Sequence, residues 1–108
     1  MQADAGDIAL AVAADHPAYA GHFPGRPVLP GVVLLAESLA ALESPALGDL
    51  TAWTLASVKF VRPVLPGTAL RLRHQRLDSG SIRFEVHGPD GPVATGTLAP
   101  RRAPGSAP

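Results

Sequence analysis

The chain contains no cysteine, which excludes disulfide bonds and thiolate metal ligands. Aromatic residues make up only 5% of the 108 residues and charged residues only 17%, whereas 46% are hydrophobic. The nine basic residues balance the nine acidic ones, so the total charge gives no indication of a nucleic-acid partner or an anionic membrane surface. The length and the apolar content suffice for one modest core, and we expect a single domain.

Long hydrophobic runs are also missing. An apolar run such as residues 32–36 is far shorter than the ~20 residues that cross a bilayer, so we expect no membrane span. The first residues, MQADAGD, lack the basic start of a signal peptide. The expectation is a soluble cytoplasmic protein.

Proline and glycine, in contrast, are concentrated in one segment. Residues 22–31 read HFPGRPVLPG, with three prolines and two glycines in ten positions. Each proline fixes its own φ and favours an extended conformation for the residue before it, whereas the glycines permit turns and close backbone approach. We therefore predict a rigid loop that presents His22 in a fixed orientation.

The hydrophobic pattern predicts an α+β domain. Residues 31–42, GVVLLAESLAAL, predict a helix that is apolar on nearly every side and is therefore buried. Strands are expected at residues 8–13, 51–61, 69–77, 81–88 and 92–99. Turn signals at 66–67, 78–80 and 89–91 separate the last four strands, which predicts hairpins between antiparallel neighbours.

Two segments carry a resemblance to a known family. Residues 21–32, GHFPGRPVLPGV, resemble the signature of bacterial 3-hydroxyacyl-acyl-carrier-protein dehydratases of the FabZ and FabA type, and residues 58–67, VKFVRPVLPG, are similar to a second segment of that family. The resemblance implies a hot-dog fold, in which a curled antiparallel sheet wraps around one central buried helix. We expect that domain at residues 1–99, and the composition of the last residues, RRAPGSAP, predicts a disordered C-terminal tail at residues 100–108.

The resemblance also implies a chemistry. These hydro-lyases convert a 3-hydroxyacyl thioester into a trans-2-enoyl thioester, without a metal or an organic cofactor. His22 takes the α-proton, the backbone amide at Gly31 binds the thioester carbonyl, and the carbonyl near Val28 orients the histidine. The unpaired N–H groups at a helix start are suited to stabilising the enolate oxygen. Phe23 and Val32 complete the substrate-binding set, although core packing is an equal interpretation of Phe23 and the preferred one for Val32.

The catalytic acid departs from the family pattern. The family carries Glu or Asp fourteen positions after the histidine, which here is Ala36, and the nearest carboxylate is Glu37. One helical step turns a side chain by about 100°. Three interpretations stay open: a bulge or shifted helix start re-aims Glu37 as the acid, Glu37 is a solvated or structural carboxylate in a non-catalytic pseudo-dehydratase, or the scaffold performs another reaction, such as that of an acyl thioesterase.

The resemblance further implies partners. The substrate is a 3-hydroxyacyl chain on the phosphopantetheine arm of an acyl carrier protein, in fatty-acid or polyene-type biosynthesis. Two subunits pair their sheets edge to edge, and each site takes the histidine from one chain and the acid from the other. We expect a homodimer or a dimer of dimers. A heterodimer with a homologue that supplies the missing acid is the alternative.

The remaining charged and aromatic residues have simpler interpretations. Solvation is the first explanation for four basic residues and docking of the carrier protein the second: Arg26, Lys59, Arg62 and Arg71. For Trp53 and Phe60, packing comes before the lining of a tunnel. The histidines outside the motif, His16, His74 and His87, are expected at the surface, and their spacing indicates no metal site.

Overall fold

The computed structural model describes residues 5–10 and 29–101. The strands are β1 (Ala5–Leu10), β2 (Trp53–Phe60), β3 (Leu70–Arg76), β4 (Ile82–Gly88) and β5 (Gly91–Pro100). The helix α2 (Gly31–Leu42) has the bounds that the sequence predicts, and it is followed by a π-helical turn η1 (Glu43–Leu47) and a 3-10 turn η2 (Leu50–Ala52). The first strand was expected at residues 8–13, of which 11–13 lie outside the described residues.

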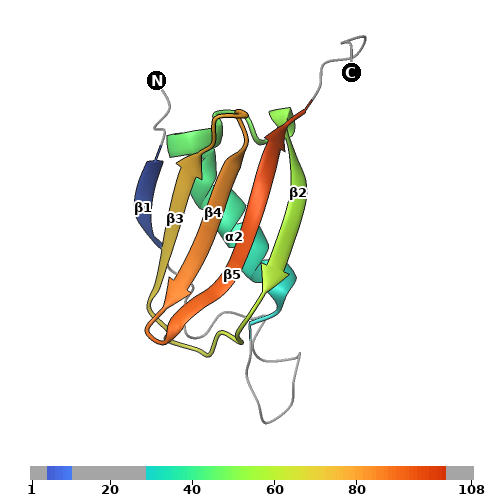
Figure 1. Ribbon diagram of the computed structural model, residues 1–108. Helices are drawn as coiled ribbons and strands as arrows, with labels where there is room; N and C mark the ends of the chain where they lie inside the picture. Colours follow the sequence, from blue (N-terminus) through green and yellow to red (C-terminus); the bar gives the residue numbers. More distant parts are fainter. Residues whose placement is uncertain (1–4, 11–28, 102–108) are drawn as a thin grey trace.

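The strands form one antiparallel sheet in the order β1-β3-β4-β5-β2, and α2 crosses one face of it (Figure 1). We call the face covered by α2 the inner face. The β3-β4-β5 meander confirms the hairpins predicted from the later turn signals. The expectation that the second strand pairs with the third is wrong. β2 pairs with β5 at one edge of the sheet, so the segment with Pro66 and Gly67 crosses toward the other edge.

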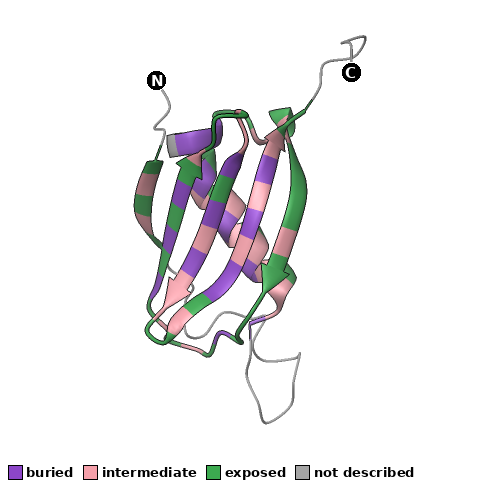
Figure 2. Cartoon of the chain, in the orientation of Figure 1, coloured by how far each residue is buried: buried purple, intermediate pink, exposed green. Residues whose placement is uncertain are grey.

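The core lies between the inner face and α2. Buried and exposed residues alternate along β3 and β4, as Figure 2 shows, because successive side chains of a strand point to opposite faces. On β4 the buried set is Ile82, Phe84 and Val86, as the alternation in the sequence predicts. The sheet therefore has one packed face and one face toward solvent.

The helix is buried on one side only. Leu34, Ser38 and Leu42 face the core, and the Ser38 hydroxyl donates a hydrogen bond to the Leu34 carbonyl (2.8 Å), which satisfies this buried polar group. Val32 and Ala36 are exposed on the opposite side. The expectation of a helix buried on nearly every side is thus wrong for the single chain, whose sheet covers one face of α2.

His74 is the clearest error of the sequence analysis, because it is 5% exposed instead of lying at the surface. The register aligns it with Gly6 on β1 and with Phe84 on β4, which in turn faces Gly96 on β5. A Cβ on Gly6 would lie 2.5 Å from the His74 Nε2 atom, and a Cβ on Gly96 would overlap the Phe84 ring. Two glycines therefore make room for the two rings in this row of the inner face.

The turn η1, which follows α2, is anchored to the sheet by Trp53 and Arg76. The indole N–H of Trp53 donates to the Leu47 carbonyl (3.0 Å), and its ring packs against the core, as expected. The Arg76 guanidinium lies 5.8 Å from the centre of that ring and donates to the Ala46 carbonyl (3.4 Å). These contacts hold η1 beside the ends of β2 and β3.

The last strand extends into the segment expected to be disordered. β5 ends at Pro100, and the Arg101 N–H donates to the Ala52 carbonyl (2.7 Å), so the expectation is wrong for residues 100 and 101. Residues 102–108 lie outside the described residues. Within residues 5–10 and 29–101, no helix is long and apolar enough to cross a bilayer.

Candidate functional site

The first turn of α2 offers backbone hydrogen-bond donors. Pro30 precedes the helix in an extended conformation, and its carbonyl accepts hydrogen bonds from the N–H groups of Val33 (3.0 Å) and Leu34 (3.1 Å). The N–H groups of Gly31 and Val32 have no acceptor within the described part of the chain. Because a helix start also carries partial positive charge, these two amides are suited to binding a carbonyl or enolate oxygen.

The two segments that carry the family resemblance meet at this helix start. The Leu29 N–H donates to the Val64 carbonyl (2.9 Å), which joins the chain entering α2 to the chain leaving β2. The ring of Phe60 lies beside Gly31, with three ring atoms 3.0–3.1 Å from the position of a Cβ on that glycine. The described end of the first segment, residues 29–32, thus contacts the second segment, residues 58–67.

The two segments that meet at this helix start carry apolar side chains that are open to solvent. The exposed fractions are 72% for Val32, 46% for Phe60 and 53% for Leu65. Val32 therefore does not belong to the core of this chain, contrary to the preferred interpretation of the sequence. The neighbouring helix residues Val33, Leu35 and Leu39 do pack against the core. Exposed apolar groups around hydrogen-bond donors suit a ligand that combines a carbonyl with a hydrocarbon chain.

Ala36, the position of the family's acid, lies on the exposed side of α2. Glu37 is half-buried on the flank of the helix, and its carboxylate has no hydrogen-bond or ion-pair partner among the described residues. The helix is regular from Gly31 to Leu42, and the π-helical turn begins only at Glu43. No bulge or late helix start therefore turns Glu37 toward the direction of residue 36.

Several predicted site residues lie outside the described residues: His22, Phe23 and Val28, together with Arg26 and His16. Of the predicted site residues, the structure therefore describes Gly31, Val32 and Glu37. The proximity of Phe60 to Gly31 was not predicted from the sequence, although both residues stand in the segments that resemble the family.

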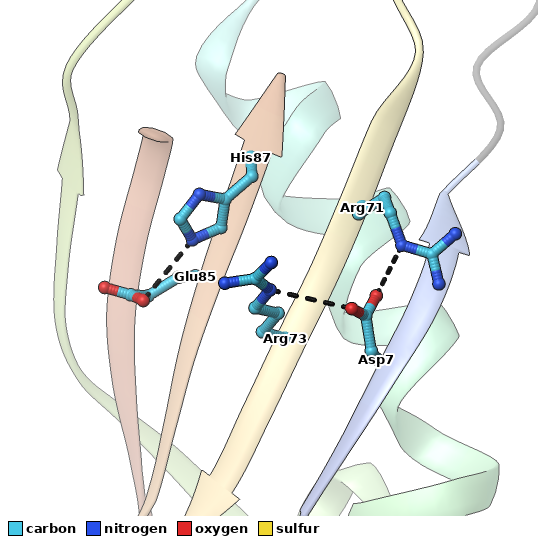
Figure 3. A network of polar contacts seen from close by, with 5 residues as sticks. All are labelled: Asp7, Arg71, Arg73, Glu85 and His87. Carbon is cyan, nitrogen blue, oxygen red and sulfur yellow. Dashed lines mark hydrogen bonds and ion pairs between the residues drawn. The ribbon is translucent and has the colours of Figure 1, made fainter. Parts of the chain in front are cut away.

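The outer face of the sheet carries a network of charges, shown in Figure 3. Asp7 accepts a hydrogen bond from the Arg71 Nε (2.6 Å) and lies 3.6 Å from the Arg73 Nε. The hydrogen bond with His87, opposed by a smaller effect of burial and reinforced by Arg83, holds the pKa of Glu85 below its ordinary value. The paired Arg71 favours the solvation interpretation over carrier docking.

A shallow hollow of about 520 Å³ lies on this outer face. Its charged lining residues are Asp7, Arg73, Arg83 and Glu85. Asp7 pairs with Arg73, and Arg83 pairs with Glu85 (3.3 Å), so the charges of the hollow neutralise one another. The start of α2 is therefore the better candidate site.

Comparison with known proteins identifies the family of the chain. Residues 1–97 match the ApeI-like family, described as ApeI dehydratase. The chain belongs to the ApeI-like dehydratase family. It is 37% identical over 90 residues to the 3-hydroxyacyl-acyl-carrier-protein dehydratase FabZ of Thermomicrobium roseum, which corresponds to 71% of this chain and 60% of that protein. FabZ of Granulibacter bethesdensis is 39% identical over 86 residues, or 71% of this chain and 51% of that protein.

The match thus spans about half to three-fifths of the length of these FabZ relatives. Among solved structures, the dehydratase heterocomplex ApeI:P from Xenorhabdus doucetiae superposes with a TM-score of 0.75 at 23% identity, covering 92% of this chain and 88% of that chain. The R-hydratase PhaJ1 from Pseudomonas aeruginosa gives 0.59 at 16% identity, covering 100% of this chain and 90% of that chain. These similarities confirm the hot-dog fold of this ApeI-like chain.

Proposed function

We propose that this chain is a subunit of a hydro-lyase that removes water from a 3-hydroxyacyl thioester. The base removes a proton from C2, the C3–O bond breaks, and the departing hydroxyl takes a proton from the acid and leaves as water. The product is the trans-2-enoyl thioester. Membership of a dehydratase family supports the reaction class, and the likeness to FabZ supports an acyl carrier protein as the carrier of the substrate.

The observation that carries this proposal is the meeting of both family segments at the start of α2. The free N–H groups of Gly31 and Val32 lie there beside exposed apolar side chains. A thioester carbonyl bound to these amides develops negative charge when the α-proton leaves, and the helix start stabilises that charge. In this proposal His22 is the base, the Val28 carbonyl orients it, and Phe23 and Val32 contact the acyl chain.

We assign the acid to Glu37, the carboxylate nearest to the position that the family uses. Its half-burial and its lack of a partner among the described residues leave the carboxylate free to act. Because α2 is regular, Glu37 must serve from the flank of the helix, about 100° away from Ala36. A flexible side chain is required to cover that difference.

A second candidate function rests on Ala36. Ala36, which is exposed at the position of the family's acid, has a methyl side chain and cannot donate a proton. In that case this chain is a non-catalytic binding subunit, or it contributes His22 to a heterodimer whose other chain supplies the carboxylate. The ApeI:P structure is described as a dehydratase heterocomplex, which favours pairing with a homologue.

Strand β2 is the proposed edge for either type of pairing. All but two of its eight residues are exposed, and within the described chain it pairs only with β5. Its exposed residues include Leu55 and Phe60, whereas the other edge strand, β1, carries the ion-paired Asp7. An exposed edge strand with unpaired backbone groups is a template for strand pairing. We propose a homodimer or dimer of dimers in the cytoplasm, each chain contributing residues 1–99 as one domain to fatty-acid or polyene-type biosynthesis.

The test is conversion of a medium-chain 3-hydroxyacyl carrier protein by the purified chain, followed by mass and ultraviolet absorbance. We expect enoyl product from the wild type and from His87→Ala, a control histidine on the outer face, but none from His22→Ala. Product from all three proteins would remove His22 from the mechanism. Absence of product from the wild type alone, with product when a homologous carboxylate-bearing chain is added, would establish the heterodimer.

A further inference from the structure

The space beside Gly31 is filled by a protein side chain. The three atoms nearest to a Cβ on Gly31 all belong to the Phe60 ring, at 3.0–3.1 Å. We propose that Phe60 is a positioning residue, whose ring fixes the place of the first-turn amides of α2 through contact with Gly31. This inference rests on the proposed function, because it assigns those amides to the thioester carbonyl.

The backbone does not require glycine at this position. Glycines with positive φ occur at residues 48, 67, 80 and 91, and Gly31 is not among them. Gly31 is the first residue of a regular helix, a backbone conformation that residues with a side chain also adopt. The requirement is therefore for space, and the Phe60 ring occupies that space.

The backbone of the Phe60 segment is held by the sheet. Phe60 is the last residue of β2 and pairs with Ala94 of β5, which is buried. The next residue, Val61, donates its N–H to the Val93 carbonyl (2.8 Å). The same segment accepts the Leu29 N–H through Val64. The entry to α2 is thus attached to the β2 exit at two points, one backbone hydrogen bond and one ring contact.

Phe60 acts on the reaction through Gly31, so it is not assigned contact with the reacting atoms. Hydrogen-bond donors stabilise a developing charge only when they stand where the charge appears, and a shift of about 1 Å can cost 10²-fold in rate. Removal of the ring frees the helix start on one side. A Cβ on Gly31 displaces the ring and the turn relative to each other, because 3.0 Å is shorter than normal carbon contact.

The test is a double-mutant cycle with the variants Gly31→Ala, Phe60→Ala and their combination, assayed on the 3-hydroxyacyl carrier protein. We expect each single variant to lower kcat about tenfold or more with little change in KM. In the Phe60→Ala background, Gly31→Ala should cause no further loss, because the obstructing ring is gone. An equal loss from Gly31→Ala in both backgrounds would show that the glycine serves the ligand and would overturn the proposal.

Two further readouts separate a positioning role from other roles. A rise in KM without loss of kcat in Phe60→Ala would mean that the ring binds substrate and would overturn the proposal. The Gly31 α-proton resonance should carry a ring-current shift in the wild type and lose it in Phe60→Ala. The control Leu77→Ala, a half-exposed apolar residue of the β3–β4 turn, should leave both kcat and the resonance unchanged.

The same spectra distinguish failure of the inference from failure of the proposed function. A Gly31 resonance that is unaltered in Phe60→Ala would overturn the ring contact, whatever the activity. A wild type that shows the ring-current shift but makes no enoyl product, alone or with a homologue, would overturn the dehydratase assignment and with it the positioning role.

Discussion

The imidazole of His74 lies against the backbone of Gly6, the residue aligned with it on the neighbouring strand β1. The His74 Nε2 atom stands 2.5 Å from the position that a Cβ on Gly6 would occupy, and Nδ1 is buried without a hydrogen-bond partner among the described residues. Burial lowers the pKa of His74 from its ordinary value of 6.5, because the charged ring would lose its hydration. Burial therefore favours the neutral form of the His74 ring in the folded protein.

This burial predicts an acid-sensitive stability. Because the folded-state pKa lies below the unfolded-state value of 6.5, the unfolded chain binds more protons as the pH falls. The contribution of His74 to the free energy of unfolding is fully present above pH 6.5 and decreases below it. His74→Leu should flatten this dependence and raise the stability on the acid side by about 1–3 kcal/mol, since it removes a buried unsatisfied group. Urea unfolding at a series of pH values measures both effects.

The carboxylate of Glu85, whose pKa is lowered from its ordinary value of 4.5, changes the stability at lower pH than His74 does. The control Leu77→Ala, which changes no titratable group, should retain the wild-type pH dependence. An unchanged slope in His74→Leu would show that His74 does not control it.

A second prediction concerns Gly96. A Cβ there would overlap the Phe84 ring and lie 3.0 Å from the Ser57 carbonyl oxygen, so neither the core nor the neighbouring strand leaves room for it. Gly96→Ala should therefore lower the free energy of unfolding by about 1–3 kcal/mol, the usual cost of overpacking. Gly88→Ala is the matched control, because its nearest contact would be an ordinary 3.5 Å. Equal stability of the two variants, measured by chemical denaturation, would contradict the inference that Gly96 makes room for the Phe84 ring.

The assignment of the acid is tested on α2 itself. If Glu37 donates the proton, Glu37→Gln should lower kcat by ~10²-fold or more, because general acid catalysis contributes at least that much. Ala36→Glu places a carboxylate on the exposed side of the helix and should raise the activity if this chain is a decayed enzyme. Steady-state kinetics of both variants distinguish Glu37 as the acid from a chain that has lost its acid at position 36. An unaffected Glu37→Gln would leave the acid to a partner subunit.

If two chains pair along β2, a suitable substitution of Ala56 should lower the mass of the assembly. This residue lies at the register shift in the middle of the strand and is exposed. Ala56→Glu introduces a charge into the proposed interface, where two copies of it would repel each other, and should produce monomers in analytical ultracentrifugation. Gln75→Glu adds the same charge to the outer face and should leave the mass of the assembly unchanged. Dissociation by both variants, or by neither, would argue against this edge.

The sequence predicted most elements because their signals are local. The helix of residues 31–42 begins after Pro30, and the alternation in β4 follows from one packed face, so these elements need no tertiary information. The pairing of β2 with β5 could not be predicted in this way. The turn signal at Pro66 and Gly67 marks a change of direction, and a crossover has the same local signal as a hairpin.

The errors in side-chain burial have a common cause, which is that exposure depends on the neighbouring elements. His74 alternates with exposed arginines on β3, and only the register reveals that Gly6 makes room for it. Val32 reads as a core residue, and only the placement of α2 against one sheet face leaves it exposed. The contact between Phe60 and Gly31 joins positions 29 residues apart, and the shared resemblance of their segments was its only signal in the sequence.

The most direct test of the dehydratase assignment is the reverse reaction in water labelled with heavy oxygen. We predict that the wild-type chain adds labelled oxygen to C3 of a trans-2-enoyl thioester while the thioester stays intact, and that His22→Ala does not. Mass spectrometry of the fragments locates the label. Label in the carboxylate of a released acid would identify a thioesterase, and an unlabelled substrate, with or without a homologous partner chain, would contradict the account.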